Sequence, residues 1–410
     1  MSEAIIILGA SALQVPLINY IKSSGYRVIV VSVPGNYPGF RYADRCIYCD
    51  IRDGEKILEQ ICNEKIVAVL TDQTDISVPT VAYLTTKLGL SGNSIDIARI
   101  YSNKHLMRNV LDDLNLPNLH HIRISKIEDA KEWKIYPAIL KPEDSQGSRG
   151  VYKVNSYNEL CEVLETTIAF SYSKFAILEE FFYGQEIVVE GFVQNGEYIN
   201  FGVGDRHYFE IKDKFIPSQT IFPTNINSTL IEKILDVERR IHSYLSPHFG
   251  MIHSEYLVNV QLESFCVVET ALRGGGVYIS SHLVPLYTGF CNYHLLLDCA
   301  LGKEVNLKTI SQNFCYKASS YMCFHLPAGK IISIEGVEML CQLEGVELCD
   351  LADLHVGGIV EPMQNKTHRK GPIILRAANR KMLGDLIDRI KNIFQVEVLT
   401  PNGLIDSIKW

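Results

Sequence analysis

The 410-residue sequence lacks several features that would assign a protein to a broad class. It has no excess of basic residues: the formal net charge is −8, which argues against general nucleic-acid binding, because neutralising phosphates needs a basic surface. It also has no apolar run long enough to cross a bilayer. The N-terminal stretch MSEAIIILGASALQV carries no basic segment before its short apolar run. We therefore expect neither a signal peptide nor membrane attachment.

The cysteines do not follow the pattern of a disulfide-rich or zinc-binding protein. The eleven cysteines are odd in number and scattered, which predicts reduced thiols and a cytoplasmic protein. Cys46 and Cys49 form a CxxC motif, but no second Cys/His pair follows at zinc-binding spacing. Because the motif lies in a strand-like run and not at a helix start, we favour a structural role for it over a redox or metal site.

Two common nucleotide-binding motifs are also absent. The first strand-like segment is followed by Gly-Ala-Ser-Ala-Leu-Gln and not by G-x-G-x-x-G, which argues against NAD or FAD binding. The order G-x-x-x-x-G-K-[S/T] of a P-loop occurs nowhere in the chain. Any nucleotide site must therefore be built in another way.

What is present is a change of pattern along the chain. Residues 1–100 alternate strand-like and helix-like segments with short connections, which predicts a doubly wound, parallel α/β domain. Residues 101–300 contain paired strands and an Asn-Gly turn, which predict an antiparallel α+β unit. Residues 301–410 are mixed and predict a C-terminal α+β subdomain, with a hairpin at 320–336 and a helix near 379–393.

The stretch ILKPEDSQGSRGVYKV places a lysine, Lys141, at the end of an apolar strand and a glycine-containing loop directly after it. Such a loop brings backbone N–H groups and hydroxyls close to an anion, here from Ser145, Gly147, Ser148 and Gly150. The stretch therefore fits a phosphate clamp. A mobile surface hairpin with incidental charge explains it equally well when it is taken alone.

The segment LEEFFYGQE joins carboxylates to aromatic side chains at a strand end. Adenine needs an apolar slot with hydrogen-bonding groups at its edge, which Glu179, Glu180, Phe181 and Phe182 would supply. Glu186 would then face the ribose hydroxyls. Taken alone, the segment is better explained as an acidic strand end that faces solvent.

Two apolar strands, GMIHSEYLVNV and SFCVVETALR, each carry one acid on a shared face. A short turn joins them, so Glu255 and Glu269 should converge, and two facing carboxylates repel unless a cation intervenes. Oxygen ligands suit magnesium, so we favour a metal site over a salt-bridged sheet surface. Arg273, followed by Gly274–Gly276, adds a fork for an anion. His253 alone would be an ordinary structural histidine.

The order of these motifs resembles the ATP-grasp superfamily, in its arrangement with a preceding α/β domain, as in biotin carboxylase and the purine-pathway ligases. The resemblance covers nearly the whole chain. It implies a pre-ATP-grasp domain at 1–100, an ATP-grasp domain at 101–300 with a lid at about 125–190, and a C-terminal subdomain at 301–410.

The resemblance also implies roles for single residues. SNKHLMR matches the first nucleotide lysine, Lys104, and Lys141 matches the second, with its phosphate-covering loop at 145–150. LEEFFYGQE matches the adenine hinge, Glu179–Phe182, with Glu186 as the ribose acid. EYL matches a magnesium glutamate, Glu255, with Leu257 under adenine. ETALR matches E-x-N-x-R, which implies a metal role for Glu269 and a catalytic role for Arg273 beside Lys141.

One position departs from the family pattern. Ala271 stands where the motif usually has Asn, a residue that often helps to hold a second magnesium. Some ATP-grasp ligases of purine synthesis look similar in this respect. We therefore expect a modified metal shell, and the sequence leaves the number of metal ions open.

Among ATP-grasp enzymes, the chain is most similar to amino-acid ligases. GMIHSE resembles their G-x-x-H-x-E, which implies substrate contacts for His253, Arg273, Gly274 and Gly275. The implied reaction activates a carboxylate with ATP as an acylphosphate, using Mg²⁺ or in its place Mn²⁺, and joins it to an amine. The implied partners are a small-molecule carboxylate and amine, and a homodimer is common among the resembled enzymes. Two alternatives stay open: a ligase of a purine-pathway ribonucleotide, and a nucleotide-binding regulator without turnover.

Overall fold

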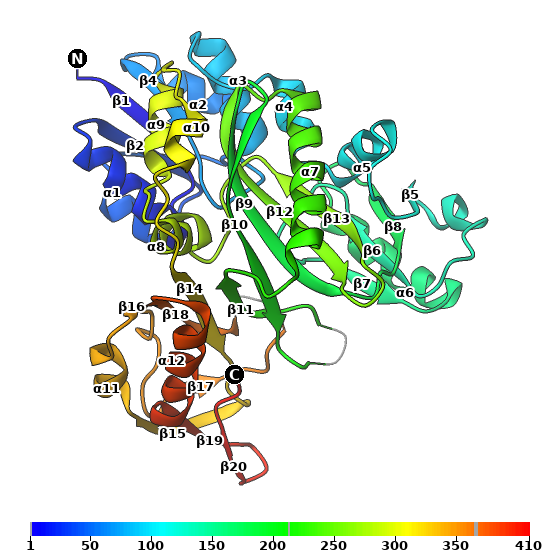
Figure 1. The fold of residues 1–410 in the computed structure, drawn as a ribbon, viewed down its shortest axis with the longest axis vertical. Helices are drawn as coiled ribbons and strands as arrows, with labels where there is room; N and C mark the ends of the chain where they lie inside the picture. Colours follow the sequence, from blue (N-terminus) through cyan, green and yellow to red (C-terminus); the bar gives the residue numbers. More distant parts are fainter. Residues whose placement is uncertain (1, 212–213, 365–367) are drawn as a thin grey trace.

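The computed structural model describes residues 2–211, 214–364 and 368–410. Figure 1 shows an α/β unit at the N-terminal flank, a long central sheet, a smaller sheet on the opposite flank and a C-terminal α+β unit beyond one end of the central sheet. Mixed α/β and α+β architecture was the prediction, and it is confirmed.

The N-terminal unit is a four-stranded parallel sheet in the order β3-β2-β1-β4. Its strands are β1 (Ala4–Leu8), β2 (Arg27–Ser32), β3 (Arg45–Tyr48) and β4 (Ile66–Leu70). Its helices are α1 (Val15–Ser23), α2 (Gly54–Ile61) and α3 (Val78–Leu88). Every residue of β1 is buried, as expected for a parallel strand covered on both faces.

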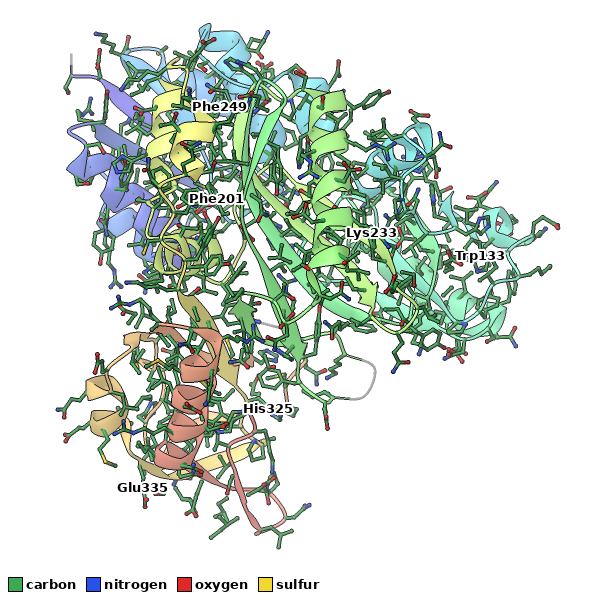
Figure 2. The ribbon with its side chains drawn as sticks, in the orientation of Figure 1. Trp133, Phe201, Lys233, Phe249, His325 and Glu335 are labelled. Carbon is green, nitrogen blue, oxygen red and sulfur yellow. The ribbon has the colours of Figure 1, made fainter. Side chains whose placement is uncertain are left out.

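The central sheet has eight strands in the order β13-β12-β9-β10-β11-β14-β18-β16. Their bounds are β9 (Gln185–Gln194), β10 (Glu197–Tyr208), β11 (Pro217–Phe222), β12 (Phe249–Asn259), β13 (Ser264–Ala271), β14 (Ala318–Phe324), β16 (Val346–Cys349) and β18 (Lys370–Ala377). Helix α7 (Ser228–Leu245) buries its apolar face against β10 and its neighbours. Phe201 and Phe249 lie on the side of the sheet that faces the N-terminal unit (Figure 2).

The smaller sheet, here the lid sheet, is antiparallel in the order β5-β8-β6-β7. Its strands are β5 (His121–Ile124), β6 (Ala138–Pro142), β7 (Tyr152–Val154) and β8 (Ala176–Glu180). Helix α6 (Tyr157–Ala169) covers it, and Trp133 lies in its separate core on the far flank of the molecule (Figure 2). Helices α4 (Ile95–Ile100) and α5 (Lys104–Asp113) connect the N-terminal unit to this sheet.

The stretch after β13 winds into short helices that pack between the N-terminal unit and the central sheet. They are η4 (Ile279–Leu283), α8 (Val284–Thr288), α9 (Tyr293–Ala300) and α10 (Leu307–Ser311).

The C-terminal unit adds a sheet in the order β17-β15-β19-β20. Its strands are β15 (Gly329–Glu335), β17 (Ile359–Val360), β19 (Gln395–Leu399) and β20 (Ile405–Ser407), with helices α11 (Val337–Gln342) and α12 (Arg380–Ile393). The helix near 379–393 is confirmed, but the hairpin at 320–336 is wrong. β14 pairs with β11 and β18, whereas β15 pairs with β17 and β19. Every residue of β14 is buried, so it needs neighbours on both sides within the central sheet.

Candidate active site

A cavity of about 1050 Å³ lies between the lid sheet, the central sheet and the N-terminal unit. It brings together most of the predicted site residues. Those that line it are Lys104, Lys141, Ser145, Gly147, Ser148, Glu179, Glu180, Phe181, Phe182, Glu186, His253, Glu255, Leu257, Glu269 and Arg273. Gly150, Gly274 and Gly275 are not among its described lining residues, although Gly276 is.

Lys104 is placed at the start of α5, where the Asn103 side chain caps the helix by accepting from the Leu106 N–H. Its ammonium lies 3.0 Å from the Glu269 carboxylate and donates to the Ser145 carbonyl oxygen at 2.9 Å. The lysine therefore touches both the β13 acid and the glycine loop. One side chain joins two motifs that the sequence separates widely.

Lys141, at the end of β6, pairs with Glu179 of β8 at 2.7 Å. Arg108 of α5 pairs with the other Glu179 oxygen at 2.6 Å, and all three side chains are buried. Burial alone would raise the pKa of Glu179, but the two cations lower it to about 2. Burial lowers the pKa of Lys141, an effect that Glu179 opposes. Glu179 thus anchors the lysine, a different environment from the adenine edge predicted for it.

The glycine loop rests on the N-terminal unit. Gln146 accepts a hydrogen bond from the Asp75 backbone N–H at 2.9 Å through its side-chain oxygen. Gly147 and Gly150 adopt left-handed backbone angles, with φ of 78° and 70°, as Ser148 does at 57°. The β6–β7 pairing confirms the predicted hairpin, and residues 145–149 of the loop line the cavity.

The end of β8 carries the predicted adenine hinge. Glu180 accepts from the His120 backbone N–H at 3.0 Å, and the Phe181 and Tyr183 rings lie 4.8 Å apart. Lys153 of β7 places its ammonium 4.1 Å from the centre of the Phe181 ring. Phe181, Phe182 and Leu257 are apolar surfaces of the cavity wall at this point.

Strands β12 and β13 pair so that Glu255 lies directly opposite Glu269. This confirms the predicted antiparallel pairing and the convergence of the two acids. Arg206 of β10 was not predicted: its guanidinium pairs with Glu255 and lies 2.7 Å from Glu186. Tyr208 also donates to Glu186. Burial, together with the nearby Glu255 carboxylate, raises the pKa of Glu186.

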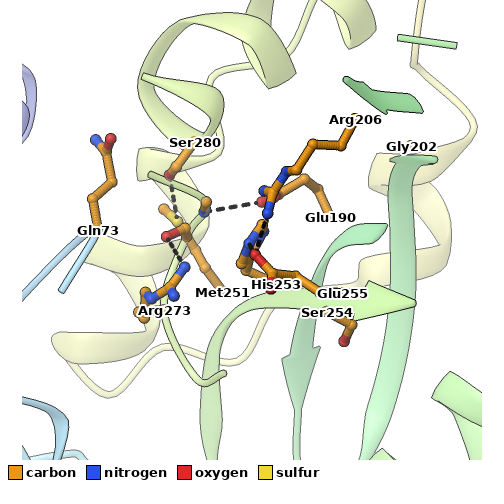
Figure 3. Close-up of polar contacts among 12 residues, drawn as sticks. Gln73, Glu190, Gly202, Arg206, Met251, His253, Ser254, Glu255, Arg273 and Ser280 are labelled. Carbon is orange, nitrogen blue, oxygen red and sulfur yellow. Dashed lines mark hydrogen bonds and ion pairs between the residues drawn. The ribbon is translucent and has the colours of Figure 1, made fainter. Parts of the chain in front are cut away.

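His253 connects this cluster to a second buried acid. One imidazole nitrogen contacts Glu190 of β9, and the other lies 3.3 Å from Glu255 (Figure 3). Burial alone would lower the pKa of His253, but Glu190 raises it. Figure 3 shows Arg206, Glu255, His253 and Glu190 as one connected chain along the sheet.

The glycine run after β13 has no room for a side chain at its first two positions, Gly274 and Gly275. A Cβ at Gly275 would lie 2.3 Å from a Glu190 oxygen, and a Cβ at Gly274 would lie 2.2 Å from the Ser280 hydroxyl. The Gly275 N–H donates to Glu190 at 3.2 Å. This close packing holds the Arg273 backbone beside the cavity. Arg273 itself is buried and grips Asp75 with two contacts of 2.7 and 3.0 Å.

Residues 72–75, here the 72–75 segment, follow Thr71 after β4 and contact four different parts of the molecule. Asp72 accepts from the Tyr293 hydroxyl at 2.7 Å, and Gln73 donates to the Leu13 carbonyl and accepts from the Tyr278 N–H. Thr74 contacts Gln146, and Asp75 binds Arg273. Burial raises the pKa of Asp72 to about 6.

The sequence patterns did not predict Asp75, Glu190 or Arg206 as site residues. A usable signal existed for Asp75, because it follows the carboxyl end of a buried parallel strand, where α/β sheets bind ligands. Glu190 is an acid inside an apolar strand, followed by a glycine. Arg206 offered no local signal, since its partners lie on β9 and β12, and only the sheet order brings them together.

Across the described residues, no group of three or more His, Cys, Asp or Glu side chains could hold a metal ion by itself. Glu255 and Glu269 remain a pair of carboxylates at one register position. Two carboxylates suit magnesium when phosphate oxygens and waters complete its shell, so the donor set fits that ion. Ala271, at the position of the usual Asn, supplies no side-chain ligand. Among the residues that the structure describes, no helix is both long enough and apolar enough to cross a membrane.

Comparisons with known proteins agree with this geometry. Residues 134–281 match the ATP-grasp domain family. The carbamoyl phosphate synthase large chain of Caldanaerobacter subterraneus subsp. tengcongensis is 23% identical over 313 residues, 72% of this chain and 27% of that one. The D-alanine–D-alanine ligase of Wigglesworthia glossinidia brevipalpis is 30% identical over 110 residues, 25% of this chain and 31% of that one.

The chain covers only 20–27% of the length of the carbamoyl phosphate synthase large chains that it matches. Among solved structures, an L-amino acid ligase from Bacillus licheniformis superimposes with a TM-score of 0.80 at 19% identity, covering 96% of this chain and 98% of that one. At this identity the similarity establishes the fold. The family match, the fold and the grouped motifs agree: residues 134–281 form an ATP-grasp domain, and the chain has ligases among its relatives and structural neighbours.

Proposed function

We propose that this chain is an ATP-dependent ligase that activates a carboxylate as an acylphosphate and joins it to an amine, with an amino acid as one substrate. The observation that carries the proposal is one cavity wall. There Glu255 and Glu269 face each other in register, Lys104 is bound to Glu269, and Lys141 lines the same cavity.

Each motif has a proposed role in holding ATP. Lys104 and Lys141 bind the phosphates, and the loop from Ser145 to Gly150 covers them with backbone N–H groups and hydroxyls. Phe181, Phe182 and Leu257 form the adenine slot, with Glu180 at its edge. Glu186 receives the ribose hydroxyls. Because Tyr208 and Arg206 already occupy its oxygens, ribose binding must share or displace one of these contacts.

Glu255 and Glu269 would hold Mg²⁺, or Mn²⁺ in its place. The ion, when bound, supplies positive charge to the β- and γ-phosphates. In its absence Lys104 and Arg206 compensate the two carboxylates, so these cations must shift when it binds. The proposal leaves open whether one or two ions bind, because Ala271 stands where the family motif usually has an Asn ligand.

The proposed chemistry has two steps. A substrate carboxylate attacks the γ-phosphorus, the bond to the β-phosphate oxygen breaks, and an acylphosphate and ADP form. The amine then attacks the acyl carbon and expels inorganic phosphate, losing a proton to solvent or a nearby base. Arg273 would steady the acylphosphate, and the backbone N–H of Gly276, the glycine of the run that lines the cavity, would meet the developing oxyanion.

Asp75 has a role in this scheme that follows from its contacts. It occupies the Arg273 guanidinium with two hydrogen bonds, as a substrate carboxylate or acylphosphate would. Arg273 lowers the pKa of Asp75, although burial alone would raise it, so the aspartate is negative at neutral pH. We infer that the Asp75 carboxylate leaves Arg273 when the anionic substrate binds. Its negative charge then attracts the incoming amine.

We also propose a cytoplasmic location, which agrees with eleven free cysteines, and a homodimer. Light scattering after gel filtration measures the latter directly. The proposed partners are small molecules: a carboxylate and an amine.

The test is ADP and phosphate release on a panel of single and paired amino acids, followed by mass spectrometry of the product. Glu269→Gln should reduce amine-dependent ADP release by at least 100-fold, because it removes one of the two metal-binding carboxylates. Glu263→Gln, on the exposed turn between the same strands, is the matched control. Normal turnover in Glu269→Gln would refute the assignment, and nucleotide binding without turnover on any substrate would favour a regulator.

A further inference from the structure

One end of the cavity is unusually basic. Among the described lining residues, those from 206–217, together with Tyr321 and Arg369, include Arg206, Lys214 and Arg369 but no carboxylate. The lining acids all come from other segments. We call Arg206, Lys214, Tyr321 and Arg369 the basic end. It stands out in a chain whose net charge is −8.

Among the described residues, the hydrogen-bond partners of Lys214 and Arg369 are neutral acceptors. The Lys214 ammonium donates to the Met363 carbonyl at 2.6 Å and to the Gln364 side-chain oxygen at 3.1 Å. Arg369 donates to the Pro217 carbonyl at 2.7 Å, and its guanidinium lies 6.0 Å from the Tyr321 ring centre. Neither has an ion pair with any described residue. Carbonyl groups orient these side chains but do not neutralise them.

Arg206 links the basic end to the proposed metal pair. Its side chain is only 8% exposed, and one terminal nitrogen serves both Glu186 and Glu255. Its Nε–H is buried and, among the described residues, has no acceptor. A buried N–H without an acceptor is costly, and native proteins rarely keep one unless a ligand or water completes it. The arginine therefore points to a ligand with an acceptor on this side of the cavity.

The reacting carboxylate belongs elsewhere, beside Glu255, Glu269 and Arg273. A group held at the basic end must then be a different part of the substrate. Resting on the proposed ligase function, we propose that the activated acid carries a second anionic group, a carboxylate or a phosphate. Lys214 and Arg369 bind this group, and Arg206 lies between it and the metal pair.

A site built from two cations that have no ion pair with a described residue discriminates strongly by charge. An uncharged analogue of the same shape leaves both cations in a partly dry cavity without their partner, and such a site typically favours its charged ligand by tenfold or more. The charge preference should appear in kcat/KM for the acid substrate and not in the KM for ATP.

The experiment uses the full chain with ATP and Mg²⁺, and hydroxylamine as the amine, so that any acylphosphate is trapped as a hydroxamate. Three matched pairs serve as the sole carboxylate: glutamate and glutamine, aspartate and asparagine, and O-phosphoserine and serine. We expect the charged member of one pair to have at least tenfold higher kcat/KM. The pair that shows the preference distinguishes a carboxylate from a phosphate.

Arg369→Gln and Lys214→Gln should each reduce that preference at least tenfold without raising the KM for ATP. Lys308→Gln, whose side chain is 82% exposed on a surface helix, is the control and should change nothing. Equal turnover of charged and uncharged members would overturn the proposal. A higher KM for ATP in the variants would also overturn it, because the basic end would then serve the nucleotide.

If no acid is turned over, the ligase function fails on this panel and the basic end is judged by binding. Calorimetry with a non-hydrolysable ATP analogue and Mg²⁺ then measures the affinity for each pair. Tighter binding of a charged member, weakened at least tenfold by Arg369→Gln, would support the basic end as an anion site. Absence of any such preference would overturn it. Circular dichroism of each variant checks that the chain is folded.

Discussion

The two ends of the cavity treat charge in opposite ways. Near Lys104 and Lys141, three sets of acids and bases are ion-paired: Lys104 with Glu269, Lys141 and Arg108 with Glu179, and Arg273 with Asp75. At the basic end, Lys214 and Arg369 contact carbonyl and amide oxygens.

The two ends therefore differ in what holds their cations before a ligand binds. At the paired end, the protein's own carboxylates hold the cations in place, so the positions exist before a nucleotide binds. A ligand there must exchange with internal partners. At the basic end Arg206 is ion-paired, but Lys214 and Arg369 have no ion pair with a described residue. Their compensating charge is left to the ligand, so this end selects the substrate by its charge.

The largest expected effect lies at the paired end. Glu179→Gln should lower the free energy of unfolding by about 3–5 kcal/mol, because it leaves Lys141 and Arg108 buried without their shared anion. Urea denaturation followed by circular dichroism measures this. A loss below about 1 kcal/mol would show that the pair is not held by its internal partner.

Lys141→Ala tests the same end by function. ADP formation should fall about 10³-fold, since a phosphate ligand disappears while Glu179 keeps Arg108 as a partner and the fold survives. A coupled ADP assay gives the rate, and Lys134→Ala, an exposed lysine shortly before the same strand, is the control. Near-normal turnover in Lys141→Ala would remove the lysine from the nucleotide site.

The third prediction concerns pH. Burial raises the pKa of Asp72 to about 6, above its unfolded value, so its neutral form stabilises the fold below pH 4 and this contribution is lost as pH rises through 6. The difference amounts to about 3 kcal/mol. Asp72→Asn should therefore be more stable than the parent at pH 8 and equally stable at pH 4. Urea unfolding of both chains at the two pH values is the measurement, and parallel pH profiles would contradict the prediction.

The smallest effect is expected at the basic end. Arg369→Gln should change the free energy of unfolding by only about 1 kcal/mol, because it removes one hydrogen bond to the Pro217 carbonyl. The same urea experiment measures it beside Glu179→Gln. Equal losses in the two variants would erase the contrast between the two ends.

The sequence predicted those parts of the site that depend on short, local patterns. Alternation along two strands predicted that Glu255 and Glu269 meet, and the structure pairs them in register. A lysine at a strand end, followed directly by a glycine-containing loop and a second strand, likewise predicted the β6–β7 hairpin.

What the sequence did not predict depends on which distant strands become neighbours. Arg206 reaches Glu186 and Glu255 because β10 pairs with β9, and β9 with β12, an order that no local pattern contains. The hairpin at 320–336 failed for the same reason, since burial on both faces drew β14 into the central sheet. The order of the motifs along the chain, and not any one motif, indicated the fold.

The 72–75 segment has a consequence for how this chain tolerates insertion and deletion. Its four successive side chains reach Tyr293 of α9, the Leu13 carbonyl, Gln146 of the glycine loop and Arg273, so one residue more or fewer would shift every contact to the wrong neighbour. Surface loops usually accept changes of length at little cost. The 72–75 segment should not tolerate a change of length. Its length should therefore be held constant when chimaeras or shortened variants of the chain are built.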